Sequence, residues 1–277
     1  RFAKPLSDPV GGTSKNKGRH PVKMETPKAS GKAPKWVLQN LNGNLQLMDS
    51  CLRLYGHPGL LSVAAAINGP DFVPKDEVTF IKEPGLGPSV AWHQDGTTHW
   101  DSPDWDQGAH GFNFMAQLYP STAGNAVWVL PGSHKMGRLD IAKKVQESGS
   151  ERLEGAVPLL CGAGEVIINN RQMLHGSFAN TSKDLRITLN EGFFPRARVL
   201  NVKTTNIFDG KEELYDEERI FKRTGIIALA IDARRQHFPE ETSYVYKPLL
   251  GDENKFRWTN ETRESILRDY NLLDMYI

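Results

Sequence analysis

The stretch from Gly164 to Ser182 reads GEVIINNRQMLHGSFANTS, and it joins a strand pattern to a polar turn and a histidine. The β-branched residues between Glu165 and Asn169, bounded by a glycine, predict a buried strand. A polar turn follows, and His175 comes directly after it. We therefore expect His175 to lie where the fold brings it beside strands that are distant in sequence.

Four more segments share this strand composition, with β-branched or aromatic residues bounded by Gly, Pro or Asn. They are Glu77–Lys82, Gly111–Tyr119, Ala126–Leu130 and Arg186–Phe194. Apolar residues from Leu45 to Asn68 recur at helical spacing and predict two short helices, and the tail from Arg223 to Tyr276 is again helical in pattern. Many strands after a helical preface favour a mainly β barrel or sandwich with flanking helices.

The composition limits the class of protein. The 277 residues include 34 Lys and Arg against 33 Asp and Glu, and this net charge of +1 argues against a nucleic-acid partner. The two cysteines have no disulfide or zinc spacing, and no segment is apolar enough to span a membrane or to act as a secretory signal. We expect a cytoplasmic protein with no membrane partner, either a monomer or a homodimer.

The chain is expected to contain a flexible arm and one catalytic domain. Residues 1–35 carry nine Lys and Arg against Asp8 and Glu25, which indicates a basic arm that is either a solvated tail or folds over an anionic substrate or cosubstrate. Residues 36–277 are expected to form the catalytic domain. Its parts are a helical preface (36–75), a strand-rich core (about 76–200) and a helical C-terminal extension (about 201–277).

The segment AWHQDG, from Ala91 to Gly96, supplies two candidate metal ligands. His93 and Asp95 are two residues apart, so in an extended strand both side chains point the same way. An HxD pair alone is weak evidence, but His175 can complete a set of two imidazoles and one carboxylate, which leaves positions open on iron(II). His99 is the nearest competing histidine, and we expect it to contact substrate or to lie in a surface loop.

Arg186 strengthens this interpretation because it begins a strand eleven residues after His175. The planar guanidinium group matches a carboxylate, so Arg186 can hold the remote end of a dicarboxylic oxoacid whose other end chelates the metal. Ser177, in the same register as His175, can add a hydroxyl group to that carboxylate.

These motifs resemble the phytanoyl-CoA dioxygenase family of iron(II)/2-oxoglutarate oxygenases over roughly Glu77 to Pro195. The matching motifs are FIKEPG (Phe80–Gly85), WHQD (Trp92–Asp95), VLPGSHKMG (Val129–Gly137), the stretch Gly164–Ser182 and the arginine of LRITL. The resemblance implies a double-stranded β-helix (a jelly-roll, cupin-like barrel) with iron held by His93, Asp95 and His175. It implies that 2-oxoglutarate is held by Arg186 and Ser177, with dioxygen as the second cosubstrate.

Other candidate residues follow from the same resemblance. Lys82 is similar to a lysine that reaches the cosubstrate in some members, although an edge-strand lysine is the alternative. Where several members place a tryptophan near the cosubstrate, this chain has Phe114, and alternation leaves open whether Phe114 or the opposite face, with Asn113 and Gln117, lines the cavity. The chain departs from the family at Gly124-Asn125-Ala126, so a local difference in that turn is expected.

The resemblance implies oxidation of a substrate with release of succinate and carbon dioxide. The retained Asp95 favours hydroxylation of an unactivated C–H bond over halogenation, while desaturation, epoxidation and rearrangement remain open. We expect a small-molecule metabolite of a biosynthetic pathway, contacted by His99 and Trp100 and, near the cavity mouth, by Arg171 and Gln172. An acyl-CoA substrate and a metal-binding barrel without 2-oxoglutarate turnover are the alternatives.

Overall fold

The computed structural model describes residues 22–25, 37–75, 77–96, 98–103, 105–106, 108–205 and 211–269. The chain divides into two compact units, of which the first contains Arg1–Asn42 and Val78–Asn190 and the second contains Gly43–Glu77 and Glu191–Ile277. We expected the helical preface and the C-terminal extension to form one domain with the barrel. The second unit contains the C-terminal extension and the preface from Gly43 onward, whereas the preface up to Asn42 belongs to the first unit.

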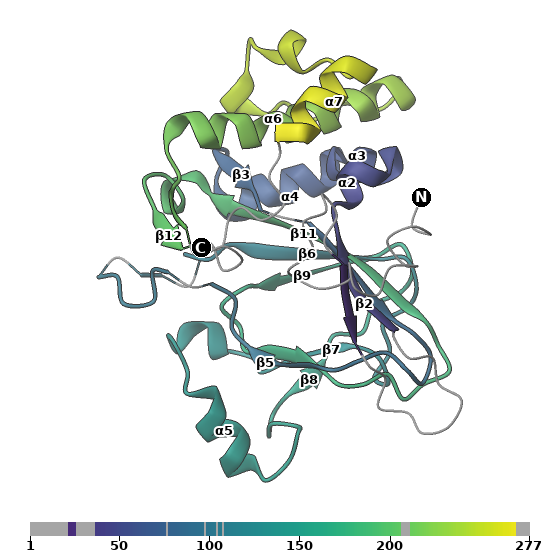
Figure 1. Ribbon diagram of the computed structural model, residues 1–277, viewed down its shortest axis with the longest axis vertical. Coiled ribbons are helices and arrows are strands. Elements are labelled where there is room, and N and C mark those ends of the chain that lie inside the picture. The colour runs from purple at the N-terminus through teal and green to yellow at the C-terminus, as the bar shows by residue number, and fades with distance from the viewer. Residues whose placement is uncertain are drawn as a thin grey trace. The chain divides into compact units, whose positions relative to one another are not determined.

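The first unit is a double-stranded β-helix, as the sequence predicts (Figure 1). Its larger sheet has the order β1-β2-β4-β11-β6-β9, and its smaller sheet has the order β5-β10-β7-β8. The strands of the larger sheet are β1 (Val22–Glu25), β2 (Val37–Asn42), β4 (Val78–Lys82), β6 (Phe112–Gln117), β9 (Val166–Asn170) and β11 (Arg186–Pro195). Those of the smaller sheet are β5 (Val90–His93), β7 (Val127–Val129), β8 (Val157–Pro158) and β10 (His175–Ser177).

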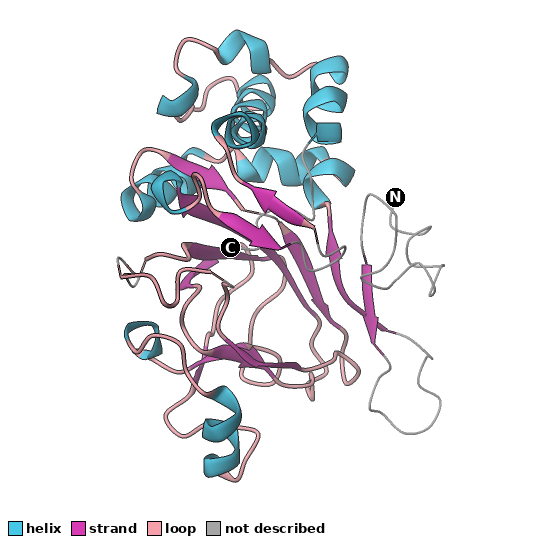
Figure 2. Ribbon diagram, turned by 60° about the vertical axis from the view of Figure 1, so that its left-hand side comes forward, coloured by secondary structure: helices cyan, strands magenta, loops and turns pink. Residues whose placement is uncertain are grey.

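The chain crosses between the two sheets in the order of a jelly roll. Strands β4, β6, β9 and β11 lie in one sheet, and β5, β7, β8 and β10 lie in the other, so successive strands mostly change sheet (Figure 2). The described pairs β1–β2, β2–β4, β4–β11, β6–β9, β5–β10, β7–β10 and β7–β8 are antiparallel. This unit also contains η1 (Ser133–Lys135) and α5 (Ile141–Ser148), whose N-cap Asp140 accepts a hydrogen bond from the Lys143 N–H at 3.0 Å.

Four residues of the expected flexible arm form a strand. Val22–Glu25 form β1 and pair with β2, with Val22 opposite Leu41 and Glu25 opposite Val37. Apolar and charged residues alternate in this VKME segment, which suits a strand with one face against protein. The rest of the arm lies outside the described residues.

The second unit is built around helix α6 (Glu217–His237). Phe193 stacks on Tyr55 with ring centroids 5.1 Å apart and meets Phe72 edge-on at 5.3 Å. The Tyr246 hydroxyl donates to the carbonyl oxygen of Phe72. The other elements are α2 (Asn44–Leu47), α3 (Asp49–Tyr55), α4 (Pro58–Asn68), β3 (Phe72–Pro74), η2 (Arg196–Arg198), β12 (Lys203–Thr205), β13 (Glu212–Leu214), η3 (Lys247–Leu249), η4 (Glu253–Phe256) and α7 (Asn260–Asp269). No helix among the described residues is long and apolar enough to cross a membrane.

Replacement of Gly56 by alanine is expected to destabilise the second unit. A Cβ atom at this position would lie 2.2 Å from the carbonyl oxygen of Ala230, a backbone atom of α6 that cannot rotate away. The φ angle of Gly56 is −83°, so the close approach rather than backbone strain requires glycine here. We expect Gly56→Ala to lower the free energy of unfolding by about 1–3 kcal/mol in urea denaturation.

Gly59→Ala is the matched control, because its Cβ would meet only the His57 side chain, at 3.2 Å, and alanine favours a helix by up to about 1 kcal/mol. Unchanged stability of Gly56→Ala would mean that the chain after α3 does not pack this closely on α6.

Candidate metal centre

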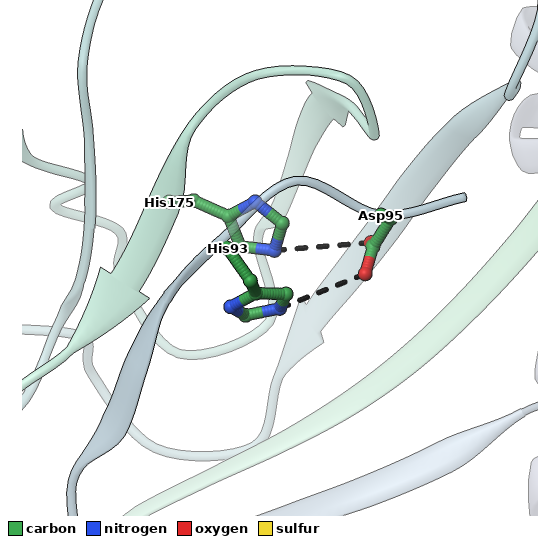
Figure 3. Close-up of side chains that lie close together, drawn as sticks. All are labelled: His93, Asp95 and His175. Atoms are coloured by element: carbon green, nitrogen blue, oxygen red, sulfur yellow. Dashed lines mark ion pairs between the residues drawn. The ribbon is translucent and has the colours of Figure 1, made fainter. Parts of the chain in front are cut away.

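The structure brings together the three predicted metal ligands. His93 ends β5 and His175 begins β10, and the two residues are direct partners across this antiparallel strand pair. Asp95 follows β5, with its Oδ1 3.6 Å from His93 Nε2 and its Oδ2 3.8 Å from His175 Nε2 (Figure 3). One potential ligand atom from each residue lies within 4.8 Å of the others. This spacing allows a single cation to bind all three.

Both imidazole rings are oriented by backbone carbonyl groups. His93 Nδ1 lies 2.8 Å from the carbonyl oxygen of Ala91, and His175 Nδ1 lies 2.7 Å from that of Met173. Each Nδ1 therefore carries the proton, and each Nε2 keeps its lone pair for a metal. Burial, with a smaller contribution from His93, lowers the pKa of His175 to about 4, so its ring is in the neutral form that binds metals.

Two of the predicted substrate residues contact Asp95. Asn113 Nδ2 donates to Asp95 Oδ2 at 3.1 Å, and Arg171 Nε lies 3.5 Å from the same oxygen. Arg171 and Gln172 are both buried. Gln172 is held from both sides, because its Nε2 donates to the Asp106 carbonyl and its own backbone carbonyl accepts from Gln94 Nε2. The expected contact of both residues with substrate near the cavity mouth stays a prediction.

A pair of buried cations lies on neighbouring strands of the larger sheet. Arg186 in β11 is the direct partner of Lys82 in β4, and each is 2% exposed. Lys82 Nζ donates to the carbonyl oxygens of Pro88 (2.5 Å) and Phe178 (2.6 Å). Arg186 Nη1 donates to the carbonyl oxygen of Asn125 at 2.7 Å, while its buried Nε has no hydrogen-bond partner among the described residues.

This pair of cations fits an anionic cosubstrate. Burial, together with the nearby Arg186 charge, lowers the pKa of Lys82 to about 7, and burial lowers that of Arg186 to about 10. Within the described part of the chain, no carboxylate forms an ion pair with either group. Uncompensated buried charge is costly, so a bound carboxylate would stabilise both cations. Asn125 lies in the turn where the sequence departs from the family, and its backbone carbonyl accepts the hydrogen bond from Arg186.

The contacts of β6 decide which face lines the site. Asn113 reaches Asp95, and Gln117, four residues later on the same face, accepts a hydrogen bond from Thr188 Oγ1 at 2.8 Å. Phe114 is fully buried on the opposite face, and its contact with substrate stays a prediction. Ser177 is buried two residues after His175 in β10, on the face that carries this histidine. Contact of Ser177 or Gln117 with the cosubstrate stays a prediction.

The two remaining substrate candidates lie in an aromatic loop after Asp95. The Trp100 ring centroid lies 4.5 Å from that of His110 and 6.3 Å from that of Trp105, and Trp100 Nε1 donates to the Gly96 carbonyl oxygen at 3.0 Å. His99 has a φ of 67° and takes no part in the metal cluster of the described residues. Their contact with substrate stays a prediction. The packing of the His110 ring against Trp100 could not be predicted from the sequence, because it depends on how the loop folds back on itself.

Comparison with known proteins gives the family. A sequence model described as Phytanoyl-CoA dioxygenase (PhyH) matches residues 35–188, more than half of the 277-residue chain. The chain belongs to the phytanoyl-CoA dioxygenase family. The matched region contains all three ligand candidates and both buried cations. Iron(II) and 2-oxoglutarate, the expected cofactor and cosubstrate, therefore fit both this family and the residues of the site.

Individual relatives match over shorter stretches. Phytanoyl-CoA dioxygenase 1 of Oryza sativa subsp. japonica is 29% identical over 109 residues, which cover 37% of this chain and 37% of the rice protein. The chain thus spans little more than a third of that curated relative. Among solved structures, AviO1 from Streptomyces viridochromogenes Tue57 is 23% identical, with a TM-score of 0.48 and coverage of 62% of this chain and 72% of that one. EctD from S. alaskensis in its apoform is 16% identical, with a TM-score of 0.48 and coverage of 69% and 66%.

His175→Ala is expected to abolish specific metal binding while the fold is retained, because a metal in a preformed barrel need not hold the fold together. Calorimetric titration with Fe(II) under anaerobic conditions should show that the Fe(II) affinity falls by more than the 10–100-fold typical of substitutions at residues that only contact a metal ligand. His134→Ala is the control, since this histidine lies in η1 outside the cluster. Normal Fe(II) affinity in His175→Ala would remove this residue from the ligand set.

The affinity of the metal-loaded chain for 2-oxoglutarate is expected to fall between about pH 6 and about pH 8. A lysine is charged below its pKa, so Lys82, with a pKa lowered to about 7, loses its positive charge as the pH rises through this range. Lys82→Met should bind 2-oxoglutarate more weakly at the lower pH and lose much of the pH dependence, as measured by titration calorimetry. The control Lys135→Met, at an exposed position, should keep the pH dependence of 2-oxoglutarate binding. A pH profile unchanged in Lys82→Met would exclude Lys82 from the anion site.

Proposed function

We propose that this protein is an iron(II)- and 2-oxoglutarate-dependent dioxygenase that hydroxylates an unactivated C–H bond of a small-molecule metabolite and releases succinate and carbon dioxide. The observation that carries this proposal is a set of three potential metal ligands in the same barrel as two buried cations that form no ion pair with any carboxylate of the described residues. Either feature alone suits several kinds of site. Together they suit a ligand with one end on a metal and a carboxylate at the other end.

Each part of the site has a separate task in this function. His93, Asp95 and His175 would hold iron from one side and leave adjacent positions for the cosubstrates. When bound, iron(II) with 2-oxoglutarate and dioxygen supplies the oxidising power for attack on a C–H bond. Arg186 and Lys82 would hold the remote carboxylate of 2-oxoglutarate by paired charges, which orients the oxoacid toward the metal.

The retained carboxylate ligand supports hydroxylation over halogenation. Asp95 occupies the position that a halide would need, and contacts from Asn113 and Arg171 hold it there. Desaturation, epoxidation and rearrangement use the same three ligands and stay alternatives, which analysis of the product would distinguish.

The substrate side of the proposal rests on the aromatic loop. Soon after Asp95 in the sequence, the Trp100 ring stacks on that of Trp105 and lies tilted against that of His110, and the His99 imidazole is tilted against His110. Aromatic faces of this kind suit a compact molecule with apolar or cyclic parts. An acyl-CoA substrate, which the rice relative's name suggests, is the alternative. It would need the basic arm near the CoA phosphates, and most of that arm lies outside the described residues.

Arg186→Ala is expected to weaken binding of 2-oxoglutarate by about 30-fold or more, because loss of one partner from a buried charge pair costs about 2–5 kcal/mol. The measurement is succinate formation under dioxygen with Fe(II), at varied 2-oxoglutarate and with a panel of candidate substrates. Arg186→Lys should recover part of the affinity, because lysine keeps the charge but not the bidentate geometry. Fe(II) affinity without 2-oxoglutarate should stay unchanged.

Arg257→Ala serves as the control, because this arginine is exposed and lies in the second unit. An unchanged KM for 2-oxoglutarate in Arg186→Ala, with normal succinate formation, would exclude Arg186 from the 2-oxoglutarate site. Absence of succinate formation by the unaltered chain with every substrate of the panel would instead favour a metal-dependent barrel that does not use 2-oxoglutarate.

A further inference from the structure

Two asparagine side chains lie side by side on the inner face of the barrel. Asn113 in β6 and Asn169 in β9 are direct partners in the antiparallel pair of these strands (Figure 1). Residues directly opposite each other in such a pair point to the same face, with Cβ atoms about 4.5–5.5 Å apart. The contact of Asn113 with Asp95 shows that this face is the one toward the metal centre. Each asparagine is 4% exposed.

The amide nitrogens of this pair donate hydrogen bonds, whereas the amide oxygens accept none. Asn113 Nδ2 donates to Asp95 Oδ2 at 3.1 Å, and Asn169 Nδ2 donates to the Asn170 carbonyl oxygen at 3.4 Å. These contacts fix which end of each amide is the oxygen, because an amide oxygen turned toward either acceptor would meet no hydrogen. Each Oδ1 atom is buried, and no donor in the part of the chain that the structure describes reaches it. The barrel interior therefore presents two adjacent hydrogen-bond acceptors.

Packing alone does not account for these two asparagines. Asparagine is depleted in strands, and a buried acceptor that loses water without gaining a donor opposes folding. A β-branched apolar residue, as at Ile167 and Ile168 just before Asn169, would suit the strand better. Positions where a sequence breaks such local rules are expected at functional sites. The two oxygens thus point to a ligand that supplies donors.

The charges beside the pair favour a neutral donor. Arg171 Nε lies 3.5 Å from Asp95 Oδ2, so the cation and the carboxylate next to Asn113 compensate each other. An ammonium ligand would add a positive charge beside Arg171, and an anionic ligand would face two acceptor oxygens. We infer that Asn113 and Asn169 form a substrate subsite for a neutral O–H or N–H donor, an inference that rests on the proposed function.

This subsite would select the carbon that is oxidised. Asn113 contacts a metal-ligand candidate with one end of its amide and offers the acceptor at the other end. A donor held there is one side chain away from the ligand set, so the C–H bonds close to the donor-bearing atom are those within reach of the metal. The substrate class is thus a compact molecule with a hydroxyl or amide N–H next to the carbon that is attacked, while its apolar part meets the aromatic loop.

The test measures the binding of matched probes to the full, metal-free chain by ligand-observed NMR. Cyclohexanol is compared with methoxycyclohexane, and cyclohexanecarboxamide with its N,N-dimethyl form, so that the members of each pair differ in the donor. The unaltered chain is expected to bind at least one donor member about 10-fold more tightly than its blocked partner. The pair that shows this preference identifies the donor as a hydroxyl or an amide N–H.

Asn169→Leu removes one acceptor oxygen, keeps a side chain of similar size and leaves the contact of Asn113 with Asp95 in place. It should reduce the preference to about threefold or less, through weaker binding of the donor member. Asn169→Asp keeps the shape and an acceptor oxygen, so it should retain the preference and separates loss of the acceptor from loss of packing. Asn68→Leu is the control, because this buried asparagine belongs to the second unit and should leave the preference unchanged.

Two results would overturn the proposal. One is equal affinity for the members of both pairs, or no binding of any probe, which is expected if ordered water satisfies the two oxygens. The other is a preference that Asn169→Leu retains in full. These measurements need neither metal nor turnover, whereas succinate formation by the unaltered chain tests the proposed function, so the failure of one is distinguishable from the failure of the other.

Discussion

The pairing of β5 with β10 is the constraint on which the site depends. It sets His93 directly opposite His175, although the two residues are far apart in the sequence. Side chains alternate between faces along a strand, so a slip of this pair by one residue would turn one imidazole to the far side of the sheet. The smaller sheet therefore needs a single register. Its strands are short, and the additional pairing of β10 with β7 helps to fix that register.

The two sheets of the barrel supply different chemistry. The smaller sheet carries the two histidines, whereas the larger sheet carries Arg186 and Lys82. A jelly roll makes this division possible because consecutive strands mostly change sheet, so one cation and one histidine come from each of two short stretches, Lys82 to His93 and His175 to Arg186. The remaining ligand candidate, Asp95, lies just beyond β5, where side chains from β6 and from the segment after β9 reach it.

Local sequence predicts those features that depend on local patterns. The five strands rich in β-branched or aromatic residues were predicted to within about two residues of their ends, and the spacing of His93 and Asp95 correctly placed them together. The contact of Arg171 with Asp95 and the inward face of β6 could not be predicted in this way. Whether a polar side chain meets substrate or a metal ligand, and which face of β6 is inside, depend on contacts between strands that no local pattern contains.

The contacts of the two buried cations have a consequence for binding energetics. Lysine and arginine side chains are long, and each carries roughly 2 kcal/mol of rotamer entropy when it is free. Lys82 is held by the carbonyl oxygens of Pro88 and Phe178, and Arg186 by that of Asn125. These contacts restrict both side chains within the folded protein. In the proposed function, an incoming dicarboxylate would meet cations that are already immobile, so the loops that provide these carbonyl groups would contribute to affinity without contacting the ligand.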